Sequence, residues 1–581
     1  MPGVLFPSGP TLSPAERPEA VGVRTLAPRP GNKESGIEIG TLGSVDESSA
    51  GLLRENEGGF GVDMWRGTRR LSVEQYLPQL PVMTASPVMR DLARRLLLSA
   101  AHPPQGATEG GSLLGLRLER LLAMGEAQAV RDLAEQAGAA MRDPAVALIY
   151  AQAALAGGDT RAACQALSTL PVGGDPSRDA AAAFNLRLSA LCQILGGQKA
   201  AANLTADLAR EQGLDDPLFY SLVAEATTGL KLKAPAPGQL EGLNVALYAA
   251  AGRPLPDNAA EIAVRALLPR LADDTMLAPE TRLRAAERAA LAGLLPGSRL
   301  SEIYLGMVFA MDEFAGLKLD RLPAKPELRH ALLHQAVLAE TDPAARAKLL
   351  SLAFTVAESD GFYRQMVEVS QPALAVLSPA ASFAGFVPEA VRAFAILGDQ
   401  RRAERWFSVL ATAETGPSKR TARELGAILR LMGTGRLPDG EAAAADIVAD
   451  FQGGSVQMKQ FAAFEALLLD ALGVVMPPRV WDVMLDANDM PPGDTPEPVM
   501  MRDLGAAVKN MRRGETIMMT LVALGERGPG AMHPNALSAI ASGLRVTGFT
   551  EEARQLALEV LMARAAWAVG AARISAEGSR G

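Results

Sequence analysis

The stretch AILGDQRRAERWFSVL, residues 395–410, places one glycine between two segments of helix-forming residues. Gly398 ends the first segment, and Ala403 follows five residues later. Glycine adopts the left-handed backbone conformation that ends many helices at little energetic cost. Asp399 is a residue type that caps the start of a following helix. The stretch therefore predicts a helical hairpin that turns at Gly398.

Three other stretches repeat this spacing of glycine and alanine, at residues 151–170, 191–209 and 543–561. The four pairs are Gly158 and Ala163, Gly197 and Ala202, Gly398 and Ala403, and Gly548 and Ala553. The residues seven positions before the glycines are also small, namely Ala151, Ala190, Val391 and Ala541. We expect the small residues of each hairpin to face each other, so that its two helices approach closely.

The composition favours helices throughout the chain. Hydrophobic residues make up 48% of the 581 residues but aromatic residues only 4%, so alanine, leucine and valine dominate. Alanine and leucine favour helices, whereas strands are rich in aromatic and β-branched residues. A chain of this length exceeds one ordinary core, and a hairpin buries its apolar face by stacking on a neighbour. The predicted fold is all-α, a right-handed superhelix of stacked helical hairpins.

Five pairs of residues mark expected helix starts, because each places a capping side chain before a proline that fits the first helical turn. They are Ser86–Pro87, Asp143–Pro144, Asp216–Pro217, Asp342–Pro343 and Ser378–Pro379. After Ser86, apolar residues recur at helical spacing at Met89, Leu92, Leu96 and Leu97.

Breaks in the helical pattern divide the chain into six parts. Residues 1–58 are rich in proline, glycine and serine and are predicted to be a disordered arm. Trp65 is expected to dock as part of a cap on the first helices. The parts are the arm at 1–58, cap helices at 59–112, hairpins at 113–232, a helical middle region at 233–440, C-terminal hairpins at 441–567 and a flexible tail at 568–581. Between about 215 and 385 the pattern is helical without a clear repeat register.

The repeated glycine turn resembles the tetratricopeptide repeat, which has a small residue in its first helix, a turn, and an alanine early in its second helix. Gly125 to Gly158 is 33 residues and Gly158 to Gly197 is 39, near the 34-residue period of that family. The chain also resembles alanine-rich bacterial solenoid proteins. It departs from the family in lacking most of the aromatic residues of the first helix, and Val130 replaces the expected alanine after Gly125.

Charge and hydropathy exclude several classes of protein. The net charge of −8 argues against broad nucleic-acid binding. No run of eighteen apolar residues predicts a transmembrane helix. The N-terminus MPGVLFPSGPTLSP lacks the basic and apolar regions of a signal peptide, which predicts a cytoplasmic protein. A true start further upstream could encode such a signal, and the protein would then be periplasmic.

Local motifs for catalysis or cofactor binding are absent from the sequence. The patterns GxxxxGK[ST], GxGxxG, GxSxG and HExxH do not occur. His330 and His334 stand four residues apart with Glu327 one turn earlier, a spacing that could hold a metal. Two histidines on the face of an amphipathic helix explain the same spacing. No cofactor, metal or catalytic residue is therefore predicted.

Cys164 and Cys192 are the two cysteines of the chain. Cys164 falls in the second helix of one predicted hairpin and Cys192 in the first helix of the next, and these helices should pack together. The pair fits two small core residues, since free cysteine is commonly buried. It also fits a disulfide between neighbouring repeats, which would require an oxidising compartment.

Taken together, these patterns predict a non-enzymatic scaffold that binds a protein or peptide on the surface of its first helices. The residues expected to face the groove are Gln152, Arg187, Arg392 and Arg545. Arginines at these positions would suit an acidic segment, because guanidinium groups bind carboxylates in pairs of hydrogen bonds. The alternatives are an envelope-associated structural or assembly protein, and an enzyme whose site is assembled from distant residues.

Overall fold

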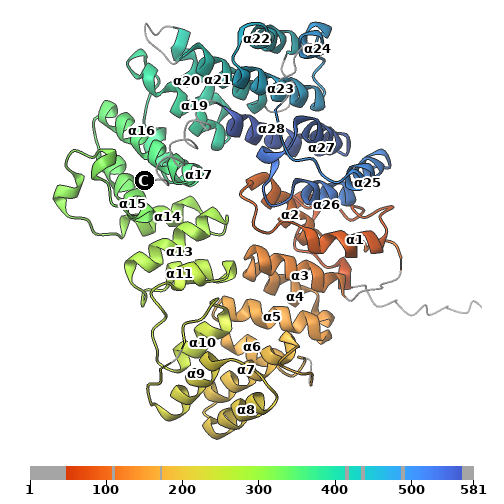
Figure 1. The fold of residues 1–581 in the computed structure, drawn as a ribbon, viewed down its shortest axis with the longest axis vertical. Helices are drawn as coiled ribbons and strands as arrows, with labels where there is room; N and C mark the ends of the chain where they lie inside the picture. Colours follow the sequence, from red (N-terminus) through yellow and green to blue (C-terminus); the bar gives the residue numbers. More distant parts are fainter. Residues whose placement is uncertain are drawn as a thin grey trace, which may run out of the picture. The chain divides into compact units, whose positions relative to one another are not determined.

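The described part of the chain is all-helical in the computed structural model (Figure 1). The structure describes residues 47–106, 112–170, 173–233, 235–411, 418–433, 439–485 and 491–565. These residues contain α-helices, short 3₁₀ helices and four isolated β-bridges, but no strand. Most of the predicted arm, including all of residues 1–46, and the whole predicted tail lie outside the described residues. Asp46–Gly581 form one compact unit.

The helices of the first half of the chain are α1 (Arg70–Tyr76), α2 (Pro87–Leu98), α3 (Leu113–Met124), α4 (Ala127–Gln136), α5 (Pro144–Ala156), α6 (Thr160–Ala166), α7 (Ala180–Leu195), α8 (Lys199–Glu211), α9 (Pro217–Thr228), α10 (Gly242–Ala250), α11 (Ala259–Ile262), α12 (Leu268–Asp273), α13 (Pro279–Leu291) and α14 (Gly297–Leu305). Those of the second half are α15 (Pro326–Ala339), α16 (Pro343–Ser359), α17 (Tyr363–Val369), α18 (Gln371–Ala375), α19 (Val387–Ile396), α20 (Gln400–Ser408), α21 (Lys419–Met432), α22 (Gly440–Gly453), α23 (Val456–Ala471), α24 (Pro478–Leu485), α25 (Pro498–Lys509), α26 (Arg513–Leu524), α27 (Pro534–Val546) and α28 (Thr550–Arg564). Ten short 3₁₀ helices, η1 to η10, lie between them in the described residues.

All four predicted glycine turns are present. The backbone φ angles are +87° at Gly158, +74° at Gly197, +70° at Gly398 and +93° at Gly548. Each turn joins two helices that pack together, in the pairs α5 and α6, α7 and α8, α19 and α20, and α27 and α28 (Figure 1). The small residues around the turns are fully buried, as predicted: Ala151, Ala163, Ala190, Ala202, Val391, Ala403, Ala541 and Ala553.

The turns at Gly158 and Gly398 also show the expected capping. The amide of Asp159 donates to the carbonyl of Ala154 at 2.8 Å, which satisfies an acceptor at the end of α5. The carboxylate of Asp159 accepts from the amide of Ala162 at 2.9 Å and so caps α6. Asp399 caps α20 in the same way through the amide of Arg402 at 3.0 Å. In these two hairpins, one short polar residue therefore starts the second helix immediately after the glycine.

A hairpin of the same kind occurs where the sequence showed no clear register. Gly361, with φ of +69°, joins α16 to α17. Phe354 lies seven residues before this glycine and Met366 five residues after it, and both are buried. Because large residues replace the small pair, the hairpin is present while the alanine signature is not. The turn at Gly125, with φ of +99°, is similar, since Val130 is buried where alanine stands elsewhere.

Four of the five predicted helix starts are confirmed. Ser86, Asp143, Asp216 and Asp342 each precede the first residue of a helix and accept a backbone amide hydrogen with their side chains. The prediction at Ser378–Pro379 is wrong, because that dipeptide lies in an irregular stretch. The following 3₁₀ segment, Ala381–Phe386, packs both of its phenylalanines against Trp406, and α19 begins only afterwards.

Cys164 and Cys192 form a disulfide between α6 and α7, with their Cα atoms 5.7 Å apart. The sequence had left two uses of these cysteines open, a core pair and a covalent link. The two helices pack together, as the hairpin assignment predicted. The bond therefore links the second helix of one hairpin to the first helix of the next.

Packing is not confined to hairpins that follow one another in sequence. Helix α10 packs against α5, α7 and α9, so the chain folds back along the earlier hairpins after α9. The short η5 helix, Arg265–Leu267, then contacts α3 and α5. Residues from about 240 to 292 consequently face the helices of residues 113–195, and a cavity described below lies between these two segments.

The first helices also pack against the last ones. Helix α2 contacts α26 and α28, and α21 contacts α28 (Figure 1). Glu526 accepts the amide hydrogens of Val82 and Met83, both at 2.8 Å. Glu559 accepts from the hydroxyl of Ser86 at 2.5 Å and from the amide of Val88 at 3.2 Å. Carboxylates from the C-terminal hairpins thus bind the segment that starts α2.

Trp65 packs against α26, in the C-terminal part of the chain. It is buried, and an added Cβ at Gly514 in α26 would lie 2.8 Å from the indole ring. The sequence predicted that Trp65 docks on the first helices; it is buried, but the contact found is with α26. Phe60 packs edge-on against Phe549, with ring centroids 5.2 Å apart.

Residues 47–58, assigned to the arm from their composition, are held against the helices. Arg117 in α3 is buried and donates to the carbonyls of Ser48 at 3.0 Å and Ala50 at 2.7 Å. The amide of Leu53 also donates to the carbonyl of Leu98 at 3.0 Å. Composition alone missed this docking because the binding partners lie about 45 to 70 residues away. None of the described helices combines the length and hydropathy needed to span a membrane.

Candidate functional site

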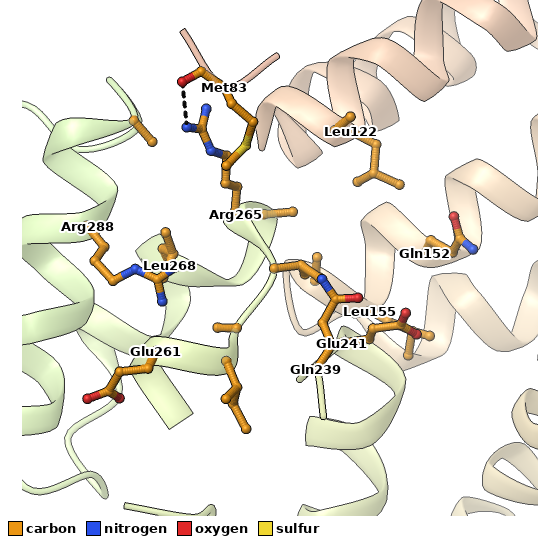
Figure 2. A pocket seen from close by; sticks show the side chains of 18 of the residues that line it. Met83, Leu122, Gln152, Leu155, Gln239, Glu241, Glu261, Arg265, Leu268 and Arg288 are labelled. Atoms are coloured by element: carbon orange, nitrogen blue, oxygen red, sulfur yellow. Dashed lines mark hydrogen bonds between the residues drawn. The ribbon is translucent and has the colours of Figure 1, made fainter. Parts of the chain in front are cut away.

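A cavity of about 880 Å³ lies between the α3–α5–α7 side of the fold and the returning segment of residues 238–292. Figure 2 shows Leu122, Gln152 and Leu155 on one side of the cavity and Leu268 and Arg288 on the other. This volume falls within the range of about 300–1,000 Å³ that is usual for ligand sites. The apolar part of the lining comes from Leu122, Leu155, Phe184, Ile262, Val264, Leu268 and Leu291.

One glycine allows the returning segment to approach α5 closely. A Cβ atom at Gly242 would lie 2.6 Å from the amide nitrogen of Ala156, closer than side chains are found in folded proteins. Gly242 begins α10, so its lack of a side chain sets how near α10 lies to α5. Leu240 pairs with Ala263 in an isolated parallel bridge, through the hydrogen bonds of Leu240 to Ile262 and of Val264 to Leu240. These contacts fix one side of the cavity.

Two arginines line the cavity, and both donate hydrogen bonds to backbone carbonyls. Arg265 donates to the carbonyls of Val82 at 2.6 Å and Met83 at 3.3 Å, and Figure 2 shows the second of these bonds. Arg288 donates to the carbonyl of Ala260. Burial lowers the pKa of both guanidinium groups below the ordinary arginine value. Arg265 thereby connects the returning segment to the chain that precedes α2.

Three carboxylates, Glu119, Glu241 and Glu261, lie among the lining residues. Glu119 accepts from its neighbour Arg120 at 2.7 Å, and Glu261 pairs with Arg284. No ion pair of Glu241 with a basic side chain is found in the described part of the chain. The lining therefore combines apolar side chains with more acidic than basic groups.

The four residues predicted to bind a partner are not brought together. Gln152 lines the cavity (Figure 2). Arg187 in α7 pairs with Asp216 at 3.3 Å, and Arg545 in α27 donates to the carbonyl of Ala471 at 2.8 Å. Arg392 is buried, pairs with Glu358 and lies over the ring of Tyr363 at 4.4 Å. The three arginines thus link neighbouring helices at separate places.

The sequence analysis missed most of the cavity because it lies at a break in the helical pattern. Residues 233–242, with the sequence KAPAPGQLEG, contain two prolines and two glycines. They supply Gly238, Gln239, Glu241 and Gly242 to the lining. Loops between rigid elements carry binding sites more often than cores do. The cluster of prolines and glycines could therefore have indicated this side of the cavity. Nothing in the sequence indicated that residues of α3 and α5 form the opposite side.

His330 and His334 lie in two different buried networks. The Nδ1 atom of His330 is 3.0 Å from Glu287 and its Nε2 atom is 2.9 Å from Asp360, while Nε2 of His334 is 2.8 Å from the hydroxyl of Ser301. No group of three or more metal-ligating side chains with suitable geometry is found in the described ranges. The contacts of the two histidines are therefore structural: His330 bonds two carboxylates, and His334 bonds a hydroxyl group.

Each histidine has a shifted pKa with a clear cause. Burial alone lowers the pKa of His330, but its hydrogen bonds to Asp360 and Glu287 outweigh burial and raise the pKa above its ordinary value. Burial lowers the pKa of His334 to about 4. Its Nδ1 atom has no hydrogen-bond partner among the described residues. The two imidazoles, one turn apart, therefore favour opposite charge states.

Comparison with protein-family models, with curated proteins and with solved structures finds no match to this chain.

Proposed function

We propose that the chain is a tetratricopeptide-like helical-repeat scaffold, with its hairpins in a right-handed superhelical array, that binds a peptide or protein segment without catalysis. The observation that supports this proposal is the cavity of about 880 Å³ between α3, α5 and the segment that contains Gly242. Its apolar walls come from helices far apart in sequence, a usual source of ligand sites.

The lining favours a partner segment that is apolar and carries a basic residue. Both lining arginines already donate to backbone carbonyls, so they have fewer donors available for an acidic ligand. Glu119 and Glu261 are paired with Arg120 and Arg284, so Glu241 is the lining carboxylate that would attract a lysine or arginine of the partner. We therefore propose a partner with a basic residue, in place of the acidic segment that the arginines in the sequence had suggested.

Photo-cross-linking tests the proposal. A photoreactive phenylalanine analogue at Gln152 would label the segment that enters the cavity, and mass spectrometry would identify it. A synthetic peptide of that sequence should then bind the whole protein in a fluorescence anisotropy assay. Ala123→Phe, which narrows the cavity from α3, should weaken binding at least tenfold.

The matched control is Ala200→Phe, at an exposed alanine of α8 outside the cavity. It should leave peptide affinity unchanged. Equal affinity of the peptide for wild type and Ala123→Phe would refute the site. Labelled segments with no shared apolar or basic character would refute the partner class.

The disulfide favours a second candidate, an envelope-associated assembly protein. The Cys164–Cys192 bond persists in oxidising compartments and is rare in the cytosol. Alkylation of thiols in intact cells, followed by mass spectrometry, tests this candidate. Alkylation of both cysteines in the native protein would rule out this candidate, whereas an intact disulfide would support export.

A further inference from the structure

A second cavity, of about 380 Å³, lies where the first, middle and last parts of the compact unit converge. Its lining comes from α2, α17, α19, α21 and α28. Leu431, Met432, Leu558 and Met562 provide apolar surface, and Arg364 and Arg554 provide guanidinium groups. This cavity shares no lining residue with the peptide cavity described above.

Arg554 is buried at this cavity, and one of its guanidinium donors, Nη1, lacks an acceptor among the described residues. The residue surface of Arg554 is 5% exposed. The ion pair of Arg364 is weak, because its partner Glu368, on the same helix, is as far as 4.0 Å away. A buried charge without a partner is strongly destabilising. Two weakly partnered guanidinium groups around one cavity therefore indicate a missing anion.

Three carboxylates, of Asp91, Glu551 and Glu559, also line the cavity, and each has a hydrogen-bond or ion-pair partner. Asp91 pairs with Arg95 at 3.1 Å, and Glu551 accepts from Gln555 at 3.3 Å. Glu559 accepts from Ser86 and from the amide of Val88 at the start of α2. The N-terminus of a helix favours a negative charge, so α2 holds the Glu559 carboxylate. Arg364 is attracted to Glu559 and Glu368, whereas the Nη1 donor of Arg554 has no acceptor among the described residues and is available to a ligand.

We infer that this cavity binds a small organic acid, with its carboxylate on Arg554 and Arg364 and its short apolar body against Leu431, Met432, Leu558 and Met562. A guanidinium group matches a carboxylate through two parallel hydrogen bonds. The ligand would touch helices from the start, middle and end of the unit, so its binding would stabilise their junction. This site is independent of the proposed peptide site.

Hexanoate is a suitable probe, and hexanamide is its uncharged counterpart. Titration of the full chain with hexanoate, followed by calorimetry and thermal unfolding, should give saturable binding and a rise in Tm. Hexanamide should do neither. Inorganic phosphate is the third arm, because guanidinium groups also bind phosphate. A response to phosphate alone, or equal responses to hexanoate and hexanamide, would overturn the inference.

Substitution of Arg554 separates a ligand site from a structural role. Arg554→Met should weaken hexanoate binding about 100-fold, the loss typical of removing one member of a buried charge pair. It should raise the Tm of the ligand-free protein by roughly 2 °C, because an unpaired buried charge is removed. Arg554→Lys keeps the charge, and should fold normally and bind about tenfold more weakly because the paired donors are lost.

The control is Arg161→Met, which removes an arginine at an exposed position of α6 outside this cavity. It should change neither hexanoate affinity nor the Tm. The inference is overturned if wild type shows no saturable hexanoate binding, or if Arg554→Met and Arg554→Lys both bind like wild type. A lower ligand-free Tm in Arg554→Met would also contradict it, since that result assigns Arg554 to packing.

Discussion

Several arginines of this protein donate to backbone carbonyls that lie far away in the sequence. Arg265, Arg270 and Arg545 each donate to a carbonyl at or near the end of a distant segment. Arg117 binds four carbonyls, and its burial lowers its pKa to about 10. A planar guanidinium group presents several donors in fixed directions, which a lysine ammonium group cannot do. The large excess of arginine over lysine in the sequence therefore has a structural use.

The two buried histidines predict opposite pH effects on stability. The pKa of His330 is raised in the folded state, so its contribution is complete at low pH and is lost as pH rises through that pKa. The pKa of His334 is lowered to about 4, so the unfolded chain takes up a proton that the folded chain does not. Between pH 6.5 and 4, that difference removes stability of order 3 kcal/mol as pH falls.

Urea unfolding between pH 4 and pH 9 measures both effects. Relative to wild type, His334→Gln should gain stability as pH falls from 6.5 to 4. Wild type should lose the His330 contribution as pH rises above the ordinary histidine pKa, and His330→Gln should not show that decline. The exposed His102 gives the control variant His102→Gln, with the wild-type profile. Parallel pH profiles for the two buried-site variants would contradict the assignment.

At the scale of elements, the hairpins could be predicted wherever small residues surround the glycine. Gly158, Gly197, Gly398 and Gly548 turn as the sequence indicated, because a positive φ angle and two close helices leave few alternatives. The hairpin at Gly361 was missed because large buried residues, Phe354 and Met366, stand at the positions where the other hairpins have small ones. A rule based on the glycine–alanine spacing therefore finds hairpins with small residues around the turn and misses hairpins with large ones.

The disulfide should make the α6–α7 pair much more resistant to local opening. It closes a loop with a sequence separation of 28 residues, for which the chain-entropy estimate is roughly 3–4 kcal/mol. In the double variant Cys164→Ala and Cys192→Ala, the opening free energy of these helices should fall by about that amount. Hydrogen exchange with mass spectrometry measures it.

The α27–α28 hairpin serves as an internal reference, because it has the same glycine turn without a disulfide. Its exchange should be the same in both proteins. Unchanged protection of α6 and α7 in the double variant would show that packing alone limits their opening.

At the scale of the whole molecule, contacts between distant segments escaped prediction. The repeat pattern indicates that neighbouring hairpins stack, but it carries no information on the packing of α10 against α5 or of α28 against α2. For the same reason, Gln152 was the one residue of the predicted four found in the lining of the cavity between α3, α5 and residues 238–292. The three predicted arginines instead form ion pairs or hydrogen bonds with neighbouring helices.

Glu526 should be important for the contact between the first and last parts of the compact unit. Its two carboxylate oxygens accept from the amides of Val82 and Met83. In Glu526→Ala these amides lose their partners, so both should exchange faster, and because the bonds are exposed to water the protein should lose only about 1 kcal/mol of stability. Hydrogen exchange and urea unfolding measure the two effects.

Glu497→Ala is the matched control, because Glu497 is exposed and its side chain does not cap the helix that follows it. It should behave like wild type in both measurements. Protected amides at Val82 and Met83 in Glu526→Ala would show that other contacts hold the segment.

The hydrogen bond between Ser86 and Glu559 joins residues 473 positions apart. A ribosome adds about 5–20 residues per second, so the partner of Ser86 is made roughly 25 to 95 seconds later. During that interval the beginning of α2 exists without the carboxylate that binds it in the finished protein. The nascent chain must therefore keep its first helices unaggregated, in water or on a chaperone, until translation is nearly complete.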